Sequence, residues 1–85
     1  MANDNKMYVR EALFETIQSQ IDKNNPRETK LTYDRLIREG LPHDEAMRLI
    51  AFVLVREMND MLKATRPFNE ARYIKALKSL PKKMP

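Results

Sequence analysis

Residues 44–62, DEAMRLIAFVLVREMNDML, decide the fold, because no other stretch of the chain is as long and as apolar. Apolar side chains recur in this segment at spacings of three and four, which is the period of an α-helix. The unbroken apolar run within it, residues 49–55, is far too short to cross a bilayer, which takes about 20 apolar residues, so we expect a core helix. Its predicted core face carries Met47, Ile50, Ala51, Leu54, Val55, Met58, Met61 and Leu62.

A second set of apolar residues lies outside that face. Leu49, Phe52 and Val53 complete an unbroken apolar run that ends at Val55. A helix that packs on one side only has a single apolar stripe. Either other helices cover both sides of this one, or the second stripe is buried against another chain. Under the second interpretation, the predicted protein interface consists of Leu49, Phe52, Val53 and Arg56.

Two helices are predicted before the central one. The apolar spacing of Val9, Leu13, Phe14, Ile17 and Ile21 predicts a first helix over residues 6–23. Proline disfavours helical geometry in the residue before it, so the following Asn-Asn-Pro segment ends that helix. The next helix is predicted to run to about residue 39, with Asn25 as its N-cap and Gly40 as its left-handed C-cap. Its expected buried residues are Tyr33, Leu36 and Ile37.

One helix is predicted after the central one. The Arg66-Pro67 pair breaks the central helix, and Asn69 is a suitable N-cap for a helix over residues 70–80. Phe68 is placed to pack on Tyr73 as a hydrophobic staple. The expected inward-facing residues are Tyr73, Ile74, Leu77 and Leu80.

These segments predict an all-α protein, a small bundle of four helices with the third helix central. The single glycine and the 33% of charged residues agree with helices rather than with a sheet that needs many tight turns. We expect one domain over residues 1–85, in which residues 1–5 and 81–85 are flexible tails.

The composition also narrows the function. The chain has no cysteine, which removes disulfides, thiolate metal sites and cysteine nucleophiles, and which agrees with a reducing compartment. The first eleven residues have no apolar core of signal-peptide length, so we expect a cytoplasmic protein. The net charge of +4 permits an acidic partner without requiring one.

The candidate chemical groups do not form a catalytic or metal-binding pattern. His43, Asp44 and Glu45 are consecutive residues at a helix start, and such residues do not converge on one point. Glu57 and Asp60 share one side of the central helix, but a di-iron bundle also requires two Glu-x-x-His motifs, which the chain lacks. We therefore predict a salt bridge from Glu57 to an arginine of a neighbouring helix. We expect no enzyme activity, no cofactor, no metal and no small-molecule substrate.

Positive charge gathers in the last twenty residues and forms a candidate basic patch. A helix that carries these side chains can lie along a phosphate backbone, although the same residues also suit a solvated helix surface. A helix-turn-helix is excluded, because its second helix would expose the apolar run from Leu49 to Val55 to DNA. The patch consists of Arg66, Arg72, Lys75, Lys78, Lys82 and Lys83.

The run TYDRLIREGLPHDEAMRLIAFVLVREMNDMLKATRPFNEARYIKALKSLP resembles a family of small bacterial all-helical hypothetical proteins. In these proteins a Thr-Tyr-x-x-Leu helix, a glycine turn, an apolar helix that begins with Glu-Ala, and an Arg-Pro-Phe-x-x-x-x-Tyr segment follow one another. The resemblance covers about residues 29–81, and its most specific part is Arg66-Pro67-Phe68 followed by Tyr73. It implies a helical fold, and it implies no activity, cofactor or catalytic residue.

Together these observations predict a binding protein rather than an enzyme. The leading hypothesis is a protein-interaction module that forms a homodimer through the central helix. The alternative is a nucleic-acid-binding accessory protein that uses the basic C-terminal helix. Membrane insertion is not expected.

Overall fold

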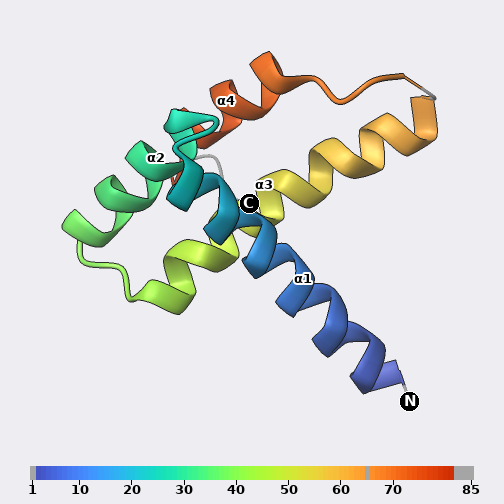
Figure 1. Cartoon of the computed structure of the whole chain (residues 1–85), viewed down its shortest axis with the longest axis horizontal. Helices are drawn as coiled ribbons and strands as arrows, with labels where there is room; N and C mark the ends of the chain where they lie inside the picture. Colours follow the sequence, from blue (N-terminus) through green and yellow to red (C-terminus); the bar gives the residue numbers. More distant parts are fainter. Residues whose placement is uncertain (1, 65, 82–85) are drawn as a thin grey trace.

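The chain folds into four helices that pack around the third, α3 (Figure 1). The computed structural model describes residues 2–64 and 66–81, with side chains from residue 10 onward. Within these residues the helices are α1 (Ala2–Lys23), α2 (Arg27–Arg38), α3 (His43–Ala64) and α4 (Glu70–Ser79), and there is no strand. Because α3 contacts each of the other three helices, the predicted all-α bundle with a central third helix is confirmed.

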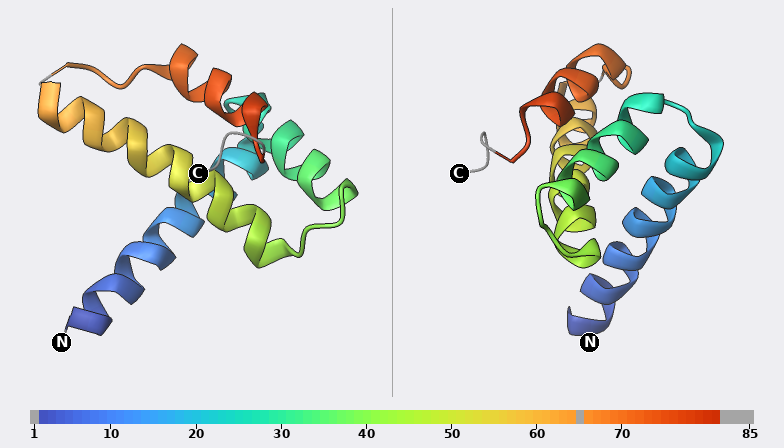
Figure 2. Two further views of the ribbon diagram at one scale, coloured as in Figure 1. Left: turned by 180° about the vertical axis from the view of Figure 1, so that it is seen from behind. Right: turned by 90° about the vertical axis from the view of Figure 1, so that its left-hand side faces the viewer.

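The helices cover α3 unevenly. α1 and α3 cross near the middle of α3, and the first half of α1 then projects away from the bundle (Figures 1 and 2). α2 and α4 lie side by side and run in the same direction along another part of α3. The last turns of α3 therefore extend beyond the crossing with α1.

The core consists of the residues that α3 presents toward its three neighbours, together with those that meet them. Met47, Ile50 and Leu54 of α3 are buried, as predicted. Ile37 was predicted to be buried but is 38% exposed, because α2 turns Thr29, Thr32 and Leu36 inward instead. The buried apolar residues are Ile17, Leu36, Ala46, Met47, Ile50, Ala51, Val53, Leu54, Tyr73, Leu77 and Leu80.

The helix boundaries follow the local sequence signals, with two differences. α1 begins at Ala2 rather than at residue 6, whereas residue 1 and residues 82–85 of the predicted tails lie outside the described part of the chain. The predicted N-cap Asn25 is wrong. Pro26 occupies the N-cap position with extended geometry, and no side chain caps this helix end.

The C-terminal end of α2 is closed as predicted by Gly40. This glycine has a φ of +99°, in the left-handed region that residues with a Cβ rarely adopt. Its N–H donates to the carbonyl of Ile37 at 3.0 Å, and the N–H of Leu41 donates to the carbonyl of Leu36 at 3.1 Å. These two bonds form a Schellman motif, and Leu41 packs against the core as the motif requires.

The start of α4 also agrees with the prediction. The side chain of Asn69 accepts a hydrogen bond of 3.0 Å from the backbone N–H of Arg72, which satisfies one free donor of the first turn. The ring of Phe68 packs edge-on against that of Tyr73, with 5.5 Å between the ring centroids. This staple sets the direction in which the chain enters α4.

A polar contact at Gln20 ties three helices together. The side-chain oxygen of Gln20 in α1 accepts hydrogen bonds from the hydroxyls of Thr29 in α2, at 2.8 Å, and Tyr73 in α4, at 2.9 Å. Both hydroxyl-bearing residues are buried, so their hydrogen-bonding groups have no access to bulk water. The contact therefore fixes α1 and α4 relative to α2.

Replacing Tyr73 with phenylalanine should make the free energy of unfolding vary less with pH in the alkaline range. Burial raises the pKa of Tyr73, since a buried phenolate loses its hydration. The unfolded chain releases this proton at about pH 10, while the folded chain retains it at higher pH. Stability should therefore fall as the pH rises above this point, and Tyr73→Phe should reduce the fall. At neutral pH the substitution should cost about 1 kcal/mol for the lost hydrogen bond.

Urea unfolding near neutral pH and near about pH 11 measures both effects, with Tyr33→Phe as the control for loss of a less buried hydroxyl. If Tyr73→Phe lost stability with pH as the wild type does, the raised pKa of Tyr73 would not be the cause of the alkaline loss of stability.

Candidate interaction surface

The structure divides the predicted interface residues between core and surface. Val53 is only 6% exposed, because α4 packs on that side of α3, and it is removed from the predicted interface. Leu49 is half-buried against the core. Phe52 is 39% exposed, and the guanidinium of Arg56 lies over its ring at 5.9 Å from the centroid. The first interpretation of the second stripe, that neighbouring helices cover it, is thus correct for Val53 and not for Phe52.

The apolar surface of α3 lies further along the helix than predicted. Met58 and Leu62 were expected in the core, but they are 40% and 69% exposed, and Val55 is half-buried. Phe52, Val55, Met58 and Leu62 are three or four residues apart, so at 100° per residue they share an arc of roughly 120°. We call these four residues the distal stripe.

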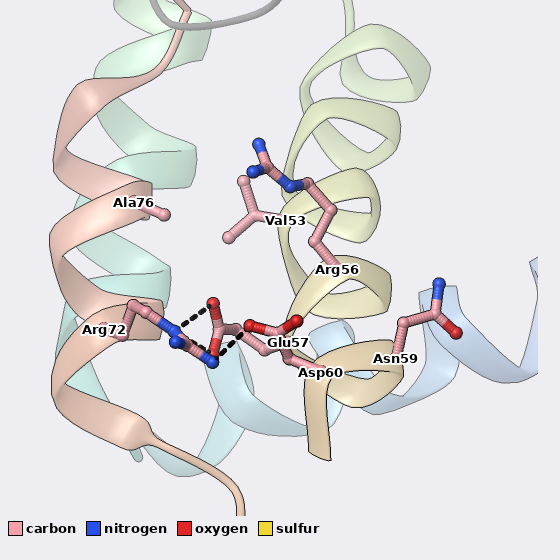
Figure 3. A pocket seen from close by; sticks show the side chains of 7 residues that line it. All are labelled: Val53, Arg56, Glu57, Asn59, Asp60, Arg72 and Ala76. Atoms are coloured by element: carbon pink, nitrogen blue, oxygen red, sulfur yellow. Dashed lines mark hydrogen bonds and ion pairs between the residues drawn. The ribbon is translucent and has the colours of Figure 1, made fainter. Parts of the chain in front are cut away.

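The distal stripe is exposed because the other helices end or diverge before they reach it. α1 crosses α3 and then runs away from its C-terminal half (Figure 1). α4 packs on a different side of α3, where Val53, Glu57 and Asp60 face it (Figure 3). The sequence places Val55, Met58 and Leu62 on the predicted core face and Phe52 outside it, and only the crossing of α1 shows that no other helix in the described part of the chain covers these residues.

A cluster of ion pairs joins α3 to α4. Nε of Arg72 donates to both carboxylate oxygens of Glu57, at 2.9 and 3.0 Å, and Nη2 of Arg72 lies 2.6 Å from a carboxylate oxygen of Asp60 (Figure 3). The Glu57 side chain is only 8% exposed, so its negative charge would destabilise the fold unless a cation paired with it. The predicted salt bridge from Glu57 to an arginine of a neighbouring helix is confirmed.

This cluster lines a half-open groove of about 450 Å³, whose wall also includes Arg56 and Ala76. The hydrogen bonds of Arg72 to Glu57, and the charges of Glu57 and Asp60, raise the pKa of Arg72, so the arginine remains a cation. One arginine bridges both carboxylates, so these three side chains join α3 to α4. The groove therefore holds a structural clamp between α3 and α4. In the described residues no group of three or more His, Cys, Asp or Glu side chains is placed to hold a metal ion.

His43 forms a contact that the sequence did not predict. Its Nδ1 lies 2.7 Å from the hydroxyl of Tyr33, and the two rings meet edge to face at 5.7 Å. Glu45 instead pairs with Arg48 at 3.0 Å. Neighbouring residues at the start of α3 therefore serve separate local contacts.

The predicted basic patch is divided in the same way. Arg72 was expected to face outward, but Glu57 and Asp60 bind it, which removes it from the patch. Arg66, Lys75 and Lys78 are exposed, and Lys82 and Lys83 lie outside the described residues. Lys78 lines a groove together with residues of α2.

No family model matches this chain, and no curated protein or solved structure matches it either. The resemblance to small bacterial helical proteins therefore stays a prediction. None of the helices in residues 2–64 and 66–81 has the length and apolar character needed to cross a membrane.

Replacing Arg72 with leucine should destabilise the chain, because Glu57 would remain buried without its partner. The urea midpoint should fall more than in Arg56→Leu, which removes an exposed arginine of the same groove. The double variant Glu57→Leu/Arg72→Leu should recover much of the loss, since it removes the buried charge as well. Equal midpoints for Arg72→Leu and Arg56→Leu would contradict the structural role of the clamp.

Proposed function

We propose that this chain is a protein-interaction module that self-associates through α3, and that it acts by binding rather than by catalysis. The observation that carries the proposal is the distal stripe, in which Phe52, Met58 and Leu62 are exposed together on one helix. Single exposed apolar residues are common on protein surfaces, whereas apolar residues grouped on one face often indicate an interface.

A second copy of the chain suits this stripe. Most soluble oligomers are symmetric, and in a twofold dimer the same patch of each subunit meets its counterpart. Helices that pair along their length use apolar residues at spacings of three and four, which is the spacing of the distal stripe. A chain of 85 residues also gains from burying such a surface, because the core of a small domain supplies limited stability.

Nucleic-acid binding through α4 is the weaker alternative. Arg72 lies in the predicted patch, but two carboxylates already bind it, and Glu57 and Asp60 would also repel a phosphate backbone there.

The absence of cysteine agrees with the cytoplasm as the proposed place of action.

Charged residues in the distal stripe should convert a dimer into a monomer. Met58→Lys/Leu62→Lys places two charges on the stripe, and burying them in an apolar contact is unfavourable. Both side chains are exposed in the single chain, so the helical content should not change. Sedimentation equilibrium measures the mass, and far-ultraviolet circular dichroism checks the fold.

The matched control is Leu31→Lys/Ile37→Lys, which changes two exposed apolar residues of α2 and should leave the dimer intact. A wild-type chain that stays monomeric at millimolar concentration would overturn the proposal. Equal weakening by both double variants would show that the contact is not specific to α3.

A further inference from the structure

A second groove lies between α2 and α4, on a part of the molecule that the distal stripe does not include. Its volume is about 320 Å³, which is near the lower limit for ligand-binding pockets and sufficient for one or two side chains. Its lining includes Glu28, Leu31, Asp34, Arg35 and Arg38 of α2 and Lys78 of α4.

Arg35 fixes the two sides of this groove relative to each other. Its guanidinium donates to the backbone carbonyls of Leu77, at 3.0 Å, and Leu80, at the C-terminal end of α4. It also lies 3.7 Å from Glu39. These contacts satisfy Arg35 within the fold, and they hold α2 and α4 together without a bound partner. The groove is therefore already formed in the isolated chain.

Two other cations of the groove have no ionic partner within the part of the chain that the structure describes. Arg38 and Lys78 are exposed and come from different helices, and neither has an ion pair among the described residues. Of the two carboxylates in the groove, Asp34 is neutralised by Lys30 at 2.9 Å. The unpaired charge at the Arg38 end of the groove is therefore positive, and it is complementary to a carboxylate-bearing partner.

An apolar side chain lies beside these cations. Leu31 is 55% exposed and is one turn and two turns along α2 from Arg35 and Arg38. An interface commonly combines an apolar contact at its centre with charged groups at its rim. Leu31 supplies the apolar contact, and Arg38 and Lys78 supply the rim.

We propose that this groove docks an acidic segment of a different protein. An apolar side chain of the partner lies against Leu31, and its carboxylates pair with Arg38 and Lys78. A nucleic acid fits less well, because its phosphates would continue past Leu31 to Glu28 at the other end of the groove, whereas a peptide needs carboxylates only at the Arg38 end. The proposal does not depend on self-association, since it uses residues of α2 and α4 only.

A peptide library identifies what the groove binds. We would select a phage-displayed library of random 15-residue peptides against the full chain and measure the affinity of the enriched peptides by fluorescence polarisation. The enriched peptides should combine Asp or Glu with Leu, Ile or Phe. Their affinity should fall about tenfold or more in Arg38→Glu/Lys78→Glu, and also in Leu31→Asp.

The matched control is Lys23→Glu/Lys75→Glu, which changes the net charge by the same amount at two exposed lysines that do not line the groove. This variant should keep the affinity, as should Met58→Lys/Leu62→Lys, which separates peptide binding from self-association. Circular dichroism of each variant excludes unfolding as the cause of a loss.

Three results would overturn the proposal. The library could give no enriched peptide, the enriched peptides could be basic or uncharged, or their affinity could be the same in Arg38→Glu/Lys78→Glu and in the control. A labelled 20-nucleotide single-stranded DNA serves as the competing probe. Binding of this DNA that is lost only in Arg38→Glu/Lys78→Glu would assign the groove to nucleic acid instead.

Discussion

The structure depends on the burial of α3 by helices that do not cover its full length. α3 has 22 residues and is about 33 Å long at 1.5 Å per residue, whereas α2 has 12 and α4 has 10 residues. α1 also has 22 residues, but it crosses α3 instead of running along it. The N-terminal half of α3 carries most of its buried residues, and its C-terminal half has α4 on one side and the distal stripe on another. This difference in cover separates a stable core from an available surface.

The sequence predicted best those features that depend on a few neighbouring residues. Gly40 ends α2, Asn69 caps α4 and Phe68 packs on Tyr73 because each of these contacts needs only local backbone geometry. The apolar period likewise predicted four helices in the correct order. Asn25 and the start of α1 at Ala2 are the exceptions among the helix ends. Asparagine is a favoured N-cap, but here Pro26 already has the extended geometry of that position.

Burial was harder to predict, because it depends on how the helices cross. Periodicity places Met58 and Leu62 on the same face as Ile50 and Leu54, and only the direction of α1 separates them into surface and core. Val53 was predicted to lie at an interface with another chain, but α4 covers it. The sequence pattern of α3 alone does not show where α4 packs. The charged residues show a parallel effect. Glu57 needed a cationic partner, but the sequence alone did not show that Arg72 supplies it.

The placement of charge gives the two proposed surfaces different properties. Ion pairs hold Arg72, and backbone carbonyls together with Glu39 hold Arg35, so these half-buried arginines join helices rather than attract partners.

Arg38 and Lys78, which have no ion pair within the described residues, lie in the same groove as Leu31, whereas the distal stripe is formed by apolar side chains. Salt should therefore weaken binding in the α2–α4 groove more than self-association, because screening acts on exposed charges and has little effect on apolar burial. In a twofold dimer the groove would occur twice. A partner with two acidic segments at the right spacing would then bind more tightly than either segment alone, without any additional contact.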